Sequence, residues 1–253
     1  MRWLVEVKEV VGDHDLVAEV VERAGYKLAA DEETGHRLLL THPKYEECET
    51  ASLVHADAKQ LADTLSRFSE LEGTLLGFAL GAVQSKQPDG TINKHLFAEL
   101  HEEINLFFSA TVTLTRNPAI SEAEHQRLIA EAEAKADEQK RLSIIRRASA
   151  ALQRPRILEV MELMNTAEPT TTQLGHIVDL VQDECGGDLG RYATRNQLKR
   201  FNHSINHPQV FGLEARHAVS AEDPPPKPMD FAKAIEFARS IGRSWLAEFE
   251  RDE

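Results

Sequence analysis

The stretch EAEHQRLIAEAEAKADEQKRLSIIRRASAALQ, residues 122–153, divides this chain of 253 residues into two parts of different character. It contains neither Gly nor Pro, and Ala, Glu, Lys, Gln and Leu, which favour helices, make up most of it. Ser121 with Glu124 three residues later is the pattern of a capping box. The sequence therefore predicts one long helix that begins near 121 and ends at Gln153.

The middle of this predicted helix, residues 131–141, has almost no large apolar side chain. Such a helix is solvated there, bridges two bodies or pairs in a weak coil. We interpret 117–153 as a connecting helix whose C-terminal half docks onto the domain that follows. The docking set is Leu142, Ile144, Ile145, Ala148 and Leu152. Heptads are not sustained, so a coiled-coil homodimer is the lesser alternative.

The residues before the helix, 1–116, mix the periods of strands and helices. Trp3, Val5 and Val7 alternate with their neighbours, as strand residues do. Helices are predicted after Gly12 and from about 50 to 72, with apolar residues at helical spacing. Further strands are predicted at 26–30, 36–41, 74–83, 91–97 and 107–115. The order β-α-β-β-α-β-β-β favours an α+β domain with a mainly antiparallel sheet and two helices.

The residues after the helix, 154–253, predict an all-α bundle. Apolar residues recur at helical spacing after Pro155 and after the capping residues Thr170, Thr194 and Asp230. Residues 224–228, PPPKP, here called the proline strap, cannot continue a helix and predict a short polyproline II crossing. The predicted fold class is therefore α+β overall, with an α+β domain, a connecting helix and a helical domain.

Composition and charge exclude several classes of protein. The formal net charge of −13 argues against a surface that binds nucleic acid or anionic membrane over its whole extent. Only Cys48 and Cys185 occur, which excludes a disulfide framework. The chain begins MRWLVEVKEVV without a signal-peptide core, and no window approaches the ~18 apolar residues of a membrane span. We expect a soluble cytoplasmic protein without membrane partner or cofactor.

One segment of the predicted bundle, RYATRNQLKRFNHSINHPQVFGLEARH at 191–217, is basic within an acidic chain. It contains five Lys and Arg residues and only one acid, Glu214. Guanidinium, amide and imidazole groups together suit an anion such as phosphate, a carboxylate or an RNA backbone. The candidate site residues are Arg195, Arg200, His203, Asn206, His207, Arg216 and His217. The alternative is a structural polar network that holds the proline strap.

Two of these residues also have a spacing found in metal sites. His203 and His207 lie four apart, so on a helix they share one face and two imidazoles could bind one metal. However, Ser204 stands where zinc proteases of the HExxH type carry their glutamate. His217 or an acid from elsewhere would have to complete the ligand set. We expect no metal.

Arg200 and His207, with six residues between them, resemble the Arg-x4-6-His motif of HEPN-type ribonucleases. That resemblance implies an all-α domain in which the arginine and the histidine act on an RNA phosphodiester, commonly across a dimer. The physical chemistry agrees, since a guanidinium neutralises phosphate and imidazole transfers protons near neutral pH. Here the histidine precedes Pro208 at the end of the predicted helix. The alternative is that both side chains interact with the last carbonyls of that helix.

A second resemblance covers roughly the last third of the chain. RFNHSINHP, Gly212, Arg216-His217, PPPKPM and the helix with Trp245-Leu246 resemble the C-terminal part of an uncharacterised group of bacterial proteins. This resemblance implies a bacterial source and a domain whose polar residues map to Asn206, Arg216 and His217. It implies no activity.

The predicted N-terminal domain offers weaker candidates. Four histidines flank its predicted strands, and acids surround one of them: His36, His42, His95 and His101 with Glu99, Glu102 and Glu103. Such groups can hold a cation, but rim histidines and a solvated acidic turn are the expectation. Residues 1–116 carry 11 Lys+Arg and 20 Asp+Glu, which suits docking of a protein partner.

These observations favour a two-domain protein whose helical domain, 154–253, binds RNA or another phosphate-bearing ligand. In its sharpest form the hypothesis is a metal-independent ribonuclease with Arg200 and His207 as catalytic residues. The alternative is a non-catalytic adaptor protein in which the Arg/His cluster is structural.

Overall fold

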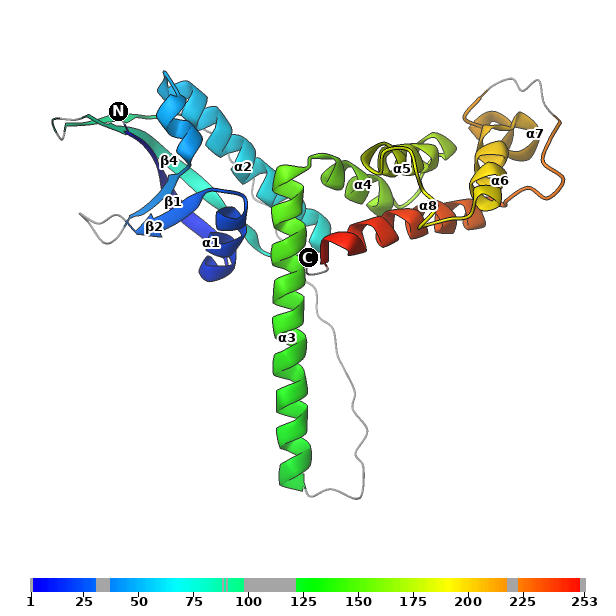
Figure 1. The fold of residues 1–253 in the computed structure, drawn as a ribbon, viewed down its shortest axis with the longest axis horizontal. Helices are drawn as coiled ribbons and strands as arrows, with labels where there is room; N and C mark the ends of the chain where they lie inside the picture. The colour runs from blue at the N-terminus through cyan, green and yellow to red at the C-terminus, as the bar shows by residue number, and fades with distance from the viewer. Residues whose placement is uncertain are drawn as a thin grey trace. The chain divides into compact units, whose positions relative to one another are not determined.

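The computed structural model describes residues 2–30, 37–87, 89, 91–97, 122–217 and 223–250. The chain divides into two compact units, Met1–Gln153 and Arg154–Glu253, called here the N-terminal and the C-terminal unit. Each unit is described by itself (Figure 1). No helix within the described residues is both long and apolar enough to cross a membrane.

The N-terminal unit is built on an antiparallel sheet. Its five strands are β1 (Arg2–Gly12), β2 (Lys27–Ala30), β3 (Leu38–Thr41), β4 (Leu76–Lys86) and β5 (Ile92–His95). They lie in the order β2-β3-β1-β4-β5, and every neighbouring pair is antiparallel. The predicted α+β class with a mainly antiparallel sheet is confirmed. The strand predicted at 107–115 lies outside the described residues.

Two helices pack on this sheet. α1 (His14–Arg23) begins at Asp13, whose carboxylate accepts two backbone N–H groups, and α2 (Ala51–Glu72) begins at Thr50. Two apolar residues near the start of α2 lie outside its buried face, because Leu53 is 56% exposed and Ala56 is exposed. Val54 and Ala58 are buried instead, since they lie on the same helical face as Leu61, Leu65 and Phe68.

The long helix α3 (Glu122–Gln153) forms as predicted, but it packs differently. Its C-terminal half contacts α1 and α2 of the N-terminal unit (Figure 1). Ser149 Oγ donates to the carbonyl of Val20 at 3.3 Å, and the Arg147 guanidinium lies 2.7 Å from Glu72. The prediction that this half docks onto the following domain was wrong. An apolar stripe shows that a face is buried, but α1 and α2 can cover it as well as a later helix can.

A polar cluster beside α2 shows what the predicted rim histidine His42 does. Its Nδ1 accepts the backbone N–H of Lys44 at 3.0 Å and so caps a short 3₁₀ helix, Pro43–Glu47. Lys44 in turn donates to the Tyr26 hydroxyl at 2.9 Å and forms an ion pair with Asp57. His42 therefore has a local structural role. His36, His101 and the acids 99, 102 and 103 lie outside the described residues.

His42 makes the stability of the N-terminal unit depend on pH. Burial lowers its pKa below the ordinary value, the Lys44 cation lowers it further, and Asp57 opposes both. The unfolded chain then binds a proton at a higher pH than the folded chain, so folding stability falls as pH drops through about 6.5. We expect His42→Asn, which keeps an acceptor for the cap, to flatten this slope. The free energy of unfolding, measured from pH 8 to about 5, gives the slope for each protein. The same slope in wild type and variant would contradict the attribution of this pH dependence to His42.

The C-terminal unit is helical throughout its regular structure. Its helices are α4 (Arg156–Asn165), α5 (Thr171–Glu184), α6 (Arg195–Asn206), α7 (Pro208–Phe211) and α8 (Phe231–Leu246). Thr170 with Gln173 and Thr194 with Gln197 form complete capping boxes, and Asp230 caps α8. α5 and α8 pack against each other, and the fully buried side chains of this unit include Ile157, Leu174, Ile177, Phe201, Ile205 and Ile241.

Candidate functional site

α6 divides its side chains between the core and an open face. Phe201, Ser204 and Ile205 are buried, and Leu198 is half-buried. The opposite stripe has the spacing i, i+3, i+4, i+7, which places its members on one side of a helix. These residues are Asn196, Lys199, Arg200 and His203. Three of the four are cationic or can become so.

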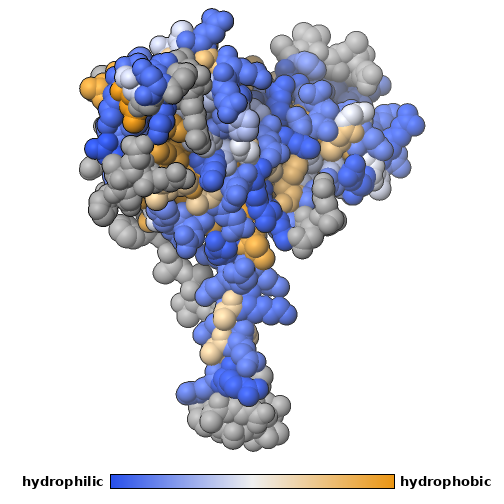
Figure 2. Space-filling model, turned by 60° about the vertical axis from the view of Figure 1, so that its left-hand side comes forward, coloured by the Kyte–Doolittle hydropathy of each residue, from blue (hydrophilic) through white to orange (hydrophobic). Residues whose placement is uncertain are grey.

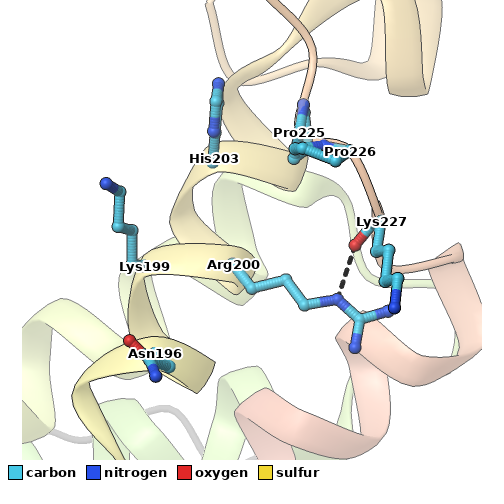
Figure 3. Close-up of a pocket in the computed structure, with 7 residues that line it drawn as sticks. All are labelled: Asn196, Lys199, Arg200, His203, Pro225, Pro226 and Lys227. Carbon is cyan, nitrogen blue, oxygen red and sulfur yellow. Dashed lines mark hydrogen bonds between the residues drawn. The ribbon is translucent and has the colours of Figure 1, made fainter.

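This open face and the proline strap line a shallow, open pocket of about 330 Å³ (Figure 3). The strap contributes Pro225, Pro226 and Lys227. Figure 3 shows His203 across from the two prolines, with Lys199 and Arg200 extending away from one another. None of the seven lining residues is acidic. The pocket thus combines apolar ring surfaces with a cationic rim, and its volume lies at the small end of ligand sites.

Arg200 joins the two walls of this pocket. Its Nε donates to the carbonyl of Lys227 at 2.6 Å, and its Nη2 donates to the carbonyl of Pro228 at 3.1 Å. The buried Ser204 hydroxyl donates to the carbonyl of Arg200 at 2.8 Å and accepts the N–H of Met229 at 2.9 Å. Arg200 therefore anchors the proline strap. This is the role that the alternative hypothesis, a structural polar network, gave to the basic segment. The strap in turn holds Lys227 at the rim.

His207 lies away from solvent. Only 2% of it is exposed, and its Nδ1 accepts the N–H of Gln209 at 3.2 Å, which caps α7. Its ring centroid lies 5.8 Å from that of His203, with the planes at 61°. His203 reaches the pocket and His207 is not among the lining residues. Arg200 and His207 thus have separate structural roles in this arrangement.

Arg216 lies across α5 rather than in the pocket. Its backbone N–H donates to the carbonyl of Ile205 at 2.8 Å, and its guanidinium lies 2.8 Å from Asp179. A Cβ on Gly175 would come within 2.7 Å of the Arg216 Nη1, so a glycine on α5 makes this crossing possible. The segment after α7 therefore folds back onto α5 and α6, and an acid of α5 pairs with the basic segment.

The remaining candidates lie outside the pocket. Arg195 and His217 are exposed, and Asn206 is half-buried with a shielded Oδ1. Sequence reasoning missed Asn196, Lys199, Pro225, Pro226 and Lys227 as a set. The helical spacing of 196, 199, 200 and 203 could have found the α6 half. The residues of the proline strap join the pocket through a contact between Arg200 and Lys227, which are 27 residues apart. Helical periodicity relates only residues a few positions apart, so it could not predict this contact.

The described part of the chain contains no group of three or more His, Cys, Asp or Glu side chains arranged to hold a metal ion. Comparison of the chain with models of known families, with curated proteins and with solved structures found no match.

Proposed function

We propose that the C-terminal unit binds RNA or another phosphate-bearing ligand in the pocket between α6 and the proline strap, without cleaving it. The observation that carries this proposal is a pocket with three cationic side chains and no acid in a chain of net charge −13. A local cationic site of this kind attracts an anion at short range although the whole molecule repels it.

Lys199 and Lys227 are the ligand-binding cations in this proposal. Both side chains are exposed at the rim, whereas the Arg200 guanidinium already donates to two carbonyls of the strap. An ammonium group is a mobile point charge with three donors, which suits phosphate oxygens in several orientations. Arg200 adds positive charge from a fixed position behind them.

The apolar walls give the pocket a second kind of contact. Pro225 and Pro226 face His203 across the opening (Figure 3). Ring surfaces of this type can contact the sugar or base of a nucleotide while the lysines bind its phosphate. Inorganic phosphate alone would use only the cations. The proposal therefore expects a nucleotide chain to bind more tightly than free phosphate.

The geometry supports binding rather than ribonuclease chemistry. A general acid or base must come within hydrogen-bond reach of the reacting atoms, and His207 is 2% exposed with its Nδ1 in use as a helix cap. In this proposal Arg200 anchors the proline strap and His207 caps α7, while the surrounding pocket holds the ligand. The proposed setting is the cytoplasm, where the free thiols Cys48 and Cys185 stay reduced.

Fluorescence anisotropy of a labelled single-stranded RNA oligonucleotide tests this proposal. We expect Lys199→Glu with Lys227→Glu to weaken binding by roughly tenfold or more, because two phosphate contacts become repulsive. The slope of log affinity against log salt should shrink by about 0.7 for each lost contact.

The matched control is Lys8→Glu, the same charge change at an exposed residue of β1 in the N-terminal unit. Wild type and control should bind alike and leave the RNA intact. Equal affinity of the wild type and the double variant would refute the assigned pocket, and cleavage that His207→Ala abolishes would restore the ribonuclease hypothesis.

A further inference from the structure

Three of the five cations in the basic segment have partners within the C-terminal unit. Arg191 donates to the carboxylate of Glu248 at 3.0 Å and 3.2 Å. Arg216 lies 2.8 Å from Asp179, and Arg200 donates to two carbonyls of the proline strap. These three guanidinium groups therefore stabilise the fold, and the two other cations of the segment differ from them.

The two other cations, Arg195 and Lys199, share the exposed face of α6. They are four residues apart, so they lie one turn, or about 6 Å, from each other along the helix axis. Both are exposed, and no acid in the described ranges forms an ion pair with either. Lys199 lines the pocket, whereas Arg195 lies outside it. Arg195 therefore adds an unpaired positive charge beside the pocket, one turn nearer the start of α6 than Lys199.

The opposite end of α6 is less open to a ligand. Asn206 is half-buried, and its Oδ1 is shielded from solvent. The backbone N–H of Arg216 donates to the carbonyl of Ile205, so the segment after α7 lies against this end of the helix. That returning segment also carries Glu214, the one acid of the basic segment. An anionic strand is thus better accommodated toward the N-terminus of α6, where the helix dipole is also positive.

We infer that the ligand of the pocket is a single strand of several nucleotides, which leaves the pocket toward the N-terminus of α6 and places its next phosphate on Arg195. The inference rests on the proposed function, in which Lys199 and Lys227 bind the phosphate inside the pocket. Figure 3 shows the path, since His203, Lys199 and Asn196 follow one another along α6 toward its start. A single strand suits this path, because its unstacked bases can contact the prolines while its phosphates follow the cations. A free phosphate or a mononucleotide would occupy the pocket without reaching Arg195.

Two oligouridylates of different length, bound to the full chain and measured by fluorescence anisotropy, test the inference. Arg195→Gln removes the outer cation and should weaken binding of a strand of about eight nucleotides by roughly three- to tenfold. The slope of log affinity against log salt for this strand should shrink by about 0.7. Binding of a dinucleotide, whose single bridging phosphate occupies the pocket alone, should stay unchanged. Lys199→Glu with Lys227→Glu should weaken binding of both.

The control is Arg243→Gln on α8, which removes the same charge from the C-terminal unit at an exposed residue that pairs with Glu236. It should bind both oligouridylates like wild type, and circular dichroism should show the same helix content in every variant. If Arg195→Gln bound the longer strand like wild type while the lysine double variant did not, the inference would be wrong and the proposed pocket would stand. An equal loss for both RNA lengths, or in Arg243→Gln as well, would also overturn the inference, because neither result needs a strand that reaches Arg195. If the lysine double variant also bound like wild type, the proposed function itself would fail.

Discussion

Gly12→Ala should destabilise the N-terminal unit by about 3–5 kcal/mol and lower its melting temperature by roughly 10 °C. Gly12 ends β1 with a φ of 89°, a backbone conformation that residues with a side chain rarely adopt. A Cβ there would lie 2.0 Å from the carbonyl oxygen of Leu75, which is backbone and cannot rotate away. The start of β4 would have to shift, because Gly12 pairs with Leu76. Thermal unfolding measured by circular dichroism gives the result.

Gly25→Ala is the matched control for this prediction. Gly25 has nearly the same φ, 92°, but an added Cβ would meet only the His42 ring, at 3.2 Å. That contact needs a shift of only a few tenths of an ångström, so the cost is mainly backbone strain of about 1–2 kcal/mol. If both variants lost the same free energy of unfolding, the close approach of Gly12 to Leu75 would not contribute to the effect.

Phe201→Ala should destabilise the C-terminal unit by about 3–5 kcal/mol, because it leaves a cavity in a close-packed core. Phe201 is fully buried, and its ring centroid lies 5.0 Å from that of Phe237 on α8. It adjoins Arg200 on α6, so its loss also loosens the helix that carries one wall of the pocket. Denaturant unfolding measures the loss, with the transition of this unit shifting alone.

Two substitutions bracket this prediction. Phe201→Leu keeps most of the apolar volume and should cost much less than Phe201→Ala. Leu213→Ala should change nothing, because Leu213 is 104% exposed. If Phe201→Ala were as mild as Leu213→Ala, α6 would not be packed on α8 in the way described.

Much of the fold could be predicted because its signals are local. Asp13, Thr170, Thr194 and Asp230 cap their helices with their own side chains, and the alternation from Trp3 to Val7 is that of a strand. Such features depend on residues a few positions apart. The partner of α3 could not be predicted, because the same apolar stripe suits α1 and α2 or a later helix.

The candidate site, like the fold, could be predicted from the sequence only where its signals are local. The sequence located the basic segment, in which Arg216 forms an ion pair with Asp179 of α5. It grouped Arg200 with His207 because they are close in sequence, whereas α6 turns them to different surroundings. Lys227 reaches the pocket only because Arg200 and Ser204 hold the strap against α6. That contact depends on tertiary structure, which no short motif encodes.

Lysine footprinting of the full chain, with and without RNA, tests the proposed pocket most directly. Acetylation of exposed lysines, followed by mass spectrometry, reports which of them the RNA shields. We expect Lys199 and Lys227 to lose reactivity when RNA is added, and Lys8 and Lys140, exposed in the N-terminal unit, to keep theirs. Unchanged reactivity at Lys199 and Lys227, or shielding confined to the N-terminal unit, would contradict binding at this pocket.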